Sequence, residues 1–162
     1  IAVFNKDAEN LIDYIRPNTI TGIFTATNIR DVNTQGLEVD AAYNFKINEF
    51  NQTLAFGYSY LDDNIMDQNP DLSRYSLNTL KHQFTTRLST QLFKNMKQNI
   101  IYKHAERTTG QSYNVWDASL IFTVKTFELT ATASNIFDAD YIETGFTPMP
   151  PSNVLLGLRY NF

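Results

Sequence analysis

The residues best suited to chemistry in this 162-residue chain are oxygen-bearing side chains in a single polar segment. Clustered carboxylate and amide oxygens are the ligands that Ca²⁺ prefers. The spacing does not match an EF-hand loop, and the glycine that its sharp turn requires is missing. We therefore favour a solvated acidic loop over residues 61–78 and keep calcium binding as the alternative. The residues concerned are Asp62, Asp63, Asn64, Asp67, Asn69 and Asp71.

No catalytic or transition-metal centre is expected. His82 and His104 lie on different expected strands, and neither has a cysteine or a second histidine beside it. The chain lacks Gly-x-Ser-x-Gly, His-Glu-x-x-His and glycine-rich phosphate-loop motifs. A carboxylate pair could be formed by Asp117 and Glu128 or by Glu38 and Asp40. Charged residues are, however, expected on a surface that faces a water-filled lumen, without any catalysis. We predict that the chain is not an enzyme and holds no metal or cofactor.

The loop DADYIETGFTPMPPS, residues 138–152, is the best candidate for contact with a ligand. Its three prolines restrict the backbone, and its aromatic and methionine side chains offer an apolar surface. A rigid loop packed over a rim is the competing interpretation. The candidate contact residues are Tyr141, Phe146 and Met149, with Arg74 and Tyr75 of the acidic loop as weaker ones.

The elements that must position these loops are β-strands. Aromatic residues make up 14% of the chain, and apolar residues alternate with polar ones, as in a sheet with one apolar and one polar face. The net charge of −4, with scattered Lys and Arg, gives no reason to expect nucleic acid as a partner. The clearest strands are 53–60, 82–93, 115–124 and 154–162, and weaker alternation predicts strands at 1–15, 23–45, 97–107 and 127–137.

Short connections alternate with long polar ones along these eight segments, which predicts an all-β, up-and-down antiparallel sheet. Short turns at one end and long loops at the other are typical of outer-membrane barrels. Aromatic residues gather near the short turns, as at a membrane interface. A soluble lipocalin-like barrel has the same strand order with an apolar interior, and alternation alone does not say which face points outward.

Two stretches carry a family resemblance. NIRDVNTQGLEVDAAYNF, residues 28–45, resembles a barrel strand of TonB-dependent outer-membrane receptors, with its Gly-hydrophobic-Glu step and alternating run to an aromatic. SNIFDADY, residues 134–141, is similar to the Asn-Leu-Phe-Asp segment of that family, with Ile136 in place of Leu. The closing strand 154–162 ends on the family's usual aromatic, and KHQFTTRLSTQLF, residues 81–93, is a weaker match.

The resemblance implies a transmembrane β-barrel of about 22 strands around a plug domain. Residues 1–162 would then be the C-terminal segment of a larger barrel, with the plug absent. The expected function is TonB-dependent uptake of a scarce nutrient chelate, such as a ferric siderophore or cobalamin, across the outer membrane of a Gram-negative bacterium. The expected partners are outer-membrane lipid, the small chelate, and the TonB complex through the missing N-terminal plug region.

The final strand also resembles the signal that the barrel-assembly machinery reads in outer-membrane proteins, and the abrupt stop at Phe162 would then be the true end of the protein. Two alternatives stay open. One is a self-contained eight-stranded structural or adhesive outer-membrane barrel, and the other is a soluble ligand-binding β-barrel. The residues expected to carry the assembly signal are Leu158, Tyr160 and Phe162.

Overall fold

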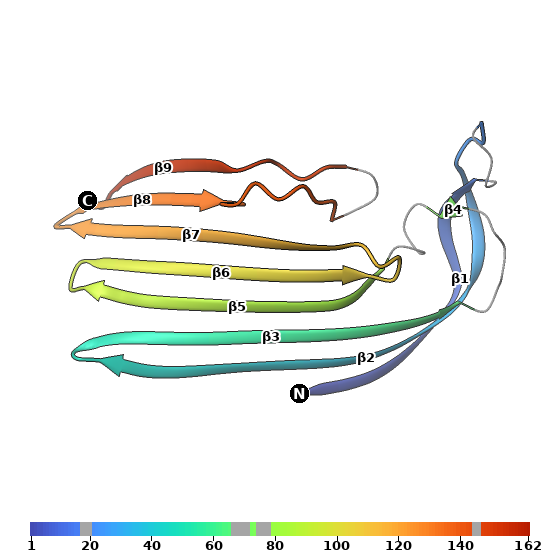
Figure 1. The fold of residues 1–162 in the computed structure, drawn as a ribbon, viewed down its shortest axis with the longest axis horizontal. Helices are drawn as coiled ribbons and strands as arrows, with labels where there is room; N and C mark the ends of the chain where they lie inside the picture. Colours follow the sequence, from blue (N-terminus) through green and yellow to red (C-terminus); the bar gives the residue numbers. More distant parts are fainter. Residues whose placement is uncertain (17–20, 66–71, 74–78, 144–146) are drawn as a thin grey trace.

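The chain forms a single antiparallel sheet (Figure 1). The computed structural model describes residues 1–16, 21–65, 72–73, 79–143 and 147–162. Among these residues there is no helix, and so none that is long and apolar enough to cross a membrane. The sheet order is β4-β1-β2-β3-β5-β6-β7-β8-β9, which confirms the all-β, up-and-down prediction for the long strands. The strands are β1 (Ala2–Arg16), β2 (Thr25–Ile47), β3 (Phe50–Ile65), β4 (Leu72–Ser73), β5 (Leu80–Phe93), β6 (Met96–Arg107), β7 (Ser112–Val124), β8 (Phe127–Ser134) and β9 (Asn153–Tyr160).

Several strands have bounds other than those expected from the sequence. The expected loop 61–78 contains a ninth strand, β4, which pairs with Ile15 and Arg16 at the end of β1. Strand β3 continues through Ile65 because its residues 61–65 pair with β2. The expected strand 127–137 was too long, since β8 ends at Ser134. Asn135 leaves the extended conformation with φ of 50°, and this stops the ladder.

Tight turns gather at one end of the sheet and long connections at the other (Figure 1). The β2–β3 turn lies between the paired residues Ile47 and Phe50, and the β7–β8 turn lies between Val124 and Phe127. The first residue of each turn has a positive φ, 55° at Asn48 and 53° at Lys125. Two-residue hairpins favour this conformation because its twist matches that of the strands. The asymmetry expected from the connection lengths is therefore present.

The alternation within each strand is kept in register across the sheet. Leu54 pairs with Leu88, and Leu120 pairs with Ala131, which in turn pairs with Leu156. Every second residue therefore contributes to one apolar face, and the residues between them contribute to one polar face. The polar face carries four charged side chains that lie within strands: Arg87, Lys103, Asp117 and Arg159.

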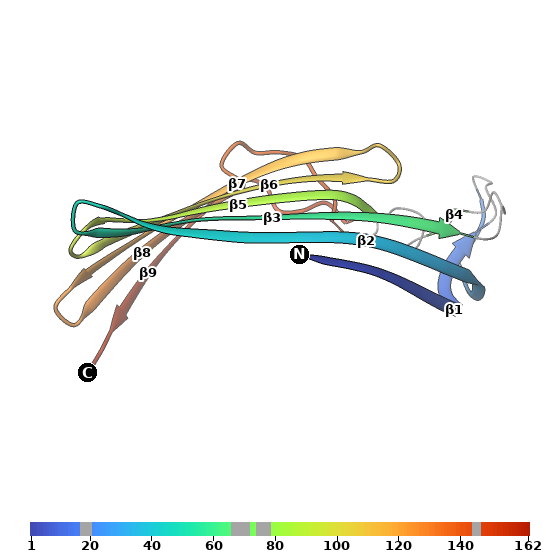
Figure 2. The ribbon, with the colours of Figure 1, turned by 90° about the horizontal axis from the view of Figure 1, so that it is seen from below.

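The sheet is one curved layer with almost no interior (Figure 2). Ala105 and Val115 are the buried hydrophobic side chains among the described residues. Large side chains of the apolar face stay exposed, including Leu156 at 76% and Tyr43 at 68%. Within the described residues, β9 at one end of the sheet does not pair with the strands at the other end, so the sheet is open. The apolar face therefore needs a cover that this part of the chain does not supply.

The glycine of the Gly-hydrophobic-Glu step is Gly36, and its environment shows why no side chain fits there. It pairs with Phe4 of β1, and the Phe4 ring lies directly over it on the polar face. A Cβ at Gly36 would lie 2.2 Å from Phe4 Cζ, which is closer than any real contact. The absence of a side chain therefore makes room for the ring.

Candidate functional site

The apolar face has aromatic rings at its tight-turn end. Tyr160 lies 5.0 Å from Phe127 and 5.1 Å from Phe162 between ring centroids. On β2, Tyr43 and Phe45 stack at 5.6 Å. The predicted gathering of aromatics beside the short turns is confirmed. It places Tyr160 and Phe162 of the proposed assembly signal in a ring cluster, and Leu158 is on the same face.

A second aromatic row, which was not predicted from the sequence, crosses the same face toward the long-loop end. Trp116 lies 4.7 Å from Tyr102 and 6.3 Å from Phe137, and the row continues through Phe84, 6.2 Å from Tyr102. From Trp116 to Phe122 the rise along β7 is roughly 20 Å. That rise is close to the apolar band of about 25 Å between the aromatic girdles of membrane barrels.

Both histidines belong to this region of the apolar face. The Tyr58 hydroxyl is 2.8 Å from His82 Nδ1, and the Tyr60 ring lies 5.0 Å from the His82 ring. His104 Nδ1 is 2.9 Å from the side-chain oxygen of Asn114. Each histidine thus has its own polar partner on the sheet. In the described part of the chain, no three His, Cys, Asp or Glu side chains gather where they could hold a metal.

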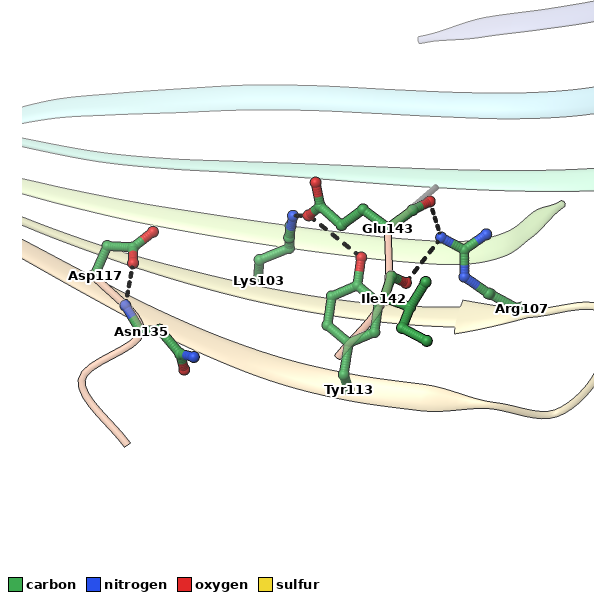
Figure 3. A network of polar contacts seen from close by, with 7 residues as sticks. All are labelled: Lys103, Arg107, Tyr113, Asp117, Asn135, Ile142 and Glu143. Atoms are coloured by element: carbon green, nitrogen blue, oxygen red, sulfur yellow. Dashed lines mark hydrogen bonds and ion pairs between the residues drawn. The ribbon is translucent and has the colours of Figure 1, made fainter. Parts of the chain in front are cut away.

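On the polar face, the loop after β8 folds back over β6 and β7 and is held by charge (Figure 3). Lys103 Nζ forms an ion pair with Glu143 Oε1, and the Tyr113 hydroxyl donates to the same oxygen at 3.4 Å. Arg107 Nη2 donates to the carbonyl oxygen of Ile142 at 3.1 Å and to that of Glu143. Three donors of the wall therefore converge on the tip of the loop.

Tyr141 packs beside this cluster. Its ring lies 4.7 Å from the Tyr113 ring, and Lys103 Nζ lies 5.6 Å from the Tyr113 centroid and 5.9 Å from that of Tyr141. Burial, and next the charge of Glu143, raise the pKa of the Tyr141 hydroxyl above its ordinary value of 10.0. The hydroxyl therefore stays neutral at physiological pH, and the ring pair adds a planar, half-buried surface to the cluster.

The base of the loop is fixed by Asn135, which is only 2% exposed. Its backbone N–H donates to Asp117 Oδ1 at 2.8 Å (Figure 3). Its side-chain oxygen accepts from the Ala139 N–H at 2.8 Å, and its side-chain N–H₂ donates to the Ala139 and Pro150 carbonyl oxygens. Asp138 Oδ1 also accepts from the Ser152 N–H at 2.8 Å. The Asn and Asp of the Asn-Ile-Phe-Asp step thus join the two arms of the loop.

Of the five predicted ligand-contact residues, the structure describes two, Tyr141 and Met149. Tyr141 lies on the polar face as described, and its carbonyl oxygen accepts from the Met149 N–H at 2.9 Å. Phe146, Arg74 and Tyr75 lie outside the described residues. Asp67 and Asp71 of the acidic loop lie outside them as well, so the solvated loop stays a prediction and calcium binding stays its alternative.

The residues that hold the tip of the loop were not predicted from the sequence. No local motif contains Lys103, Arg107, Tyr113 or Glu143. Lys103 and Glu143 are 40 residues apart in the chain. The available signal was the polar phase of β6 and β7, which places residues 103, 113 and 117 on one face. The cluster can bind oxygen-rich anions through Lys103, Arg107 and Tyr113.

A one-layer antiparallel sheet with an aromatic-bounded apolar face, a polar face, tight turns at one end and long loops at the other defines a class: the wall of a membrane β-barrel. The family model described as "TonB dependent receptor-like, beta-barrel" matches residues 1–136, and the chain belongs to that family. Members of this family are outer-membrane receptors and transporters rather than enzymes.

The match ends at residue 136. The resemblance in residues 28–45 therefore lies within it, whereas most of the Asn-Ile-Phe-Asp segment and the closing strand lie beyond it. Their resemblance to the family stays a prediction. No curated protein matches the chain.

Proposed function

We propose that this chain forms the C-terminal wall of an outer-membrane receptor for TonB-dependent uptake of a scarce nutrient chelate, of the ferric siderophore or cobalamin class. One observation supports this most directly: the apolar face is exposed and bounded at both ends by aromatic rings, on a sheet of the receptor family. Lipid is the cover that such a face requires, because exposed apolar surface of this extent is unfavourable in water.

In this proposal the tight turns face the periplasm and the long loops face the exterior of a Gram-negative cell, as in outer-membrane barrels generally. The polar face lines the lumen beside a plug encoded upstream, through which the TonB complex acts. The barrel-assembly machinery recognises the C-terminal segment that carries Leu158, Tyr160 and Phe162. The loop candidates Tyr141, Phe146, Met149, Arg74 and Tyr75 contribute to capture of the chelate at the outer rim.

Uptake by intact cells tests the proposal. Cells that carry the full receptor gene as their only such receptor should accumulate one labelled ferric chelate or cobalamin. The same cells without TonB should accumulate none. Uptake of no chelate, or equal uptake with and without TonB, would exclude energy-coupled transport and favour a structural or adhesive barrel.

Extraction behaviour tests the membrane part of the proposal separately. The chain should require detergent or lipid to stay folded and dispersed, because its apolar face has no cover of its own. A monomeric, soluble protein that keeps its β-structure without detergent would favour the soluble-barrel alternative.

A further inference from the structure

The side chains around Glu143 surround its carboxylate as a binding site surrounds a bound anion. Lys103 Nζ and the Tyr113 hydroxyl both point at Glu143 Oε1, and Arg107 supplies a further N–H to the two adjoining carbonyl oxygens. An ammonium and a phenol at the carboxylate, with a guanidinium on the adjoining carbonyl oxygens, are donors that proteins use to bind an oxyanion. Here the oxyanion belongs to the chain itself.

The loop is anchored firmly at its base and by weaker contacts at its tip. The base depends on Asn135, whose side chain is buried and hydrogen-bonded within the loop. The tip is held by the hydrogen bonds of Arg107 and Tyr113 and by an ion pair whose side chains are 27% exposed at Lys103 and 33% exposed at Glu143. Partly exposed ion pairs are weak and exchangeable. Residues 140–143 can therefore leave the wall while the base stays in place.

Removing Glu143 from the wall would take away the carboxylate that Lys103 and the Tyr113 hydroxyl contact. Asp117, on the same face, accepts the Asn135 N–H at the base of the loop. A free anion would thus meet the Lys103 ammonium and the Tyr113 phenol without displacing Asp117, with the Arg107 guanidinium beside them. The Tyr113 ring beside them adds a flat surface for an unsaturated or planar ligand.

We propose that Lys103, Arg107 and Tyr113 form a carboxylate-binding site, which the closed loop fills with Glu143 as an internal competitor. A ligand carboxylate replaces Glu143, and the loop tip is released. The inference rests on the receptor function proposed above, because a ligand must reach the polar face of the barrel. It narrows the substrate class to a chelate that presents a carboxylate.

Citrate binding to the purified full-length receptor tests this site, with the affinity measured by calorimetry at constant ionic strength. Glu143→Gln removes the competing charge, so citrate should bind about two- to fivefold more tightly, the factor that a partly exposed ion pair supplies. Lys103→Met should weaken citrate binding, also in the Glu143→Gln background. Glu143→Asp keeps the carboxylate and should stay close to the wild type.

Two matched controls lie on the same strand. Glu106→Gln removes one negative charge from the opposite face of β6, and Lys97→Met removes one positive charge from the polar face near the tight turns. Neither should change citrate affinity. Equal affinity in the wild type and Glu143→Gln, or no citrate binding by either, would overturn the proposal.

Loop position gives a second readout. Spin labels placed at Asp140 and Gln111, both exposed, should move apart when citrate is added to the wild type. In Glu143→Gln they should already be farther apart without citrate. An unchanged distance in both proteins would contradict displacement of the tip. Loss of TonB-dependent uptake in cells would instead overturn the receptor function and would leave the citrate result standing.

Discussion

At the scale of single residues, Asn135 determines how the chain leaves the sheet. Its φ of 50° ends β8, and its amide then bonds to both arms of the loop that follows. Asparagine suits this position because it tolerates the left-handed conformation and carries both a donor and an acceptor. The Asn of the family-like segment is therefore explained by backbone geometry and hydrogen bonding.

Replacing Asn135 should loosen the base of the loop. Asn135→Ala leaves the Ala139 N–H without its acceptor and strains the positive φ, which should destabilise the base by about 2–4 kcal/mol. Asn135→Gly should cost less, since glycine relieves the strain but restores no hydrogen bond. Hydrogen exchange at Ala139 is the measurement. Asn153→Ala is the control because Asn153 is exposed; comparable acceleration in both variants would refute the assigned role.

Gly36 makes room for the Phe4 ring, and this too can be measured. Gly36→Ala should destabilise the folded protein by about 1 kcal/mol, because the Phe4 ring must move off the new methyl group. In a Phe4→Ala background the same substitution should cost almost nothing, which a double-mutant cycle in urea would show. If the cost is the same in both backgrounds, contact with Phe4 is not the reason for the glycine.

At the scale of elements, two consecutive leucines of β9 lie on opposite faces of the sheet. Leu155 and Leu156 are exposed to similar extents, 70% and 76%. Leu155 pairs with Thr132 on the polar face, whereas Leu156 pairs with Ala131 in the middle of the apolar face. The same substitution at Leu155 and at Leu156 therefore compares the polar face of the barrel wall with its apolar face.

Arginine substitutions at this pair should give different results. Leu156→Arg places a charge at the middle of the lipid-facing band and should destabilise the full receptor in vesicles by about 2–4 kcal/mol. Leu155→Arg faces the polar side and should change stability by less than about 1 kcal/mol. The urea dependence of folding into phospholipid vesicles would measure both. Equal effects would mean that the apolar face does not contact lipid.

At the scale of the whole molecule, the described residues form one sheet without the second layer that a water-soluble domain packs against its apolar face. Its strands are instead joined edge to edge by backbone hydrogen bonds, which a membrane barrel needs because lipid offers no partners to the peptide groups. Aromatic clusters at both ends of the apolar face suit the two membrane interfaces. Assembly of the full receptor should therefore be sensitive to these end clusters.

Deleting Phe162 tests the terminal cluster. The full receptor without Phe162 loses the ring that packs edge-on against Tyr160, and its outer-membrane level should fall several-fold. Asn161→Ala leaves the ring in place and should not lower that level. Quantification in isolated outer membranes would decide, and a normal level without Phe162 would count against its role in assembly.

The sequence by itself determined the strands, their two faces and their family resemblance. Alternation in segments such as 53–60 and 154–162 depends on the period of the pleat, which each strand carries locally. Connection lengths likewise predicted which end of the sheet has tight turns. The end of β8 was misplaced because Phe137 keeps the apolar phase of Leu129 and Ala131 along the sequence. The positive φ of Asn135, which ends the strand, accompanies bonds to Asp117 and Ala139 that the local pattern does not show.

Only the tertiary structure decided which distant residues form a site. Antiparallel register places Lys103 opposite Val115 and so brings Tyr113 of β7 close to it. The Asn135 turn then returns the loop across that face and brings Glu143 to Lys103 from 40 residues away. Ion pairs of this kind depend on through-space distance, which no local pattern encodes. Strand identity is a local property of the chain, whereas the cluster around Glu143 exists only after the strands have paired and the loop has folded back.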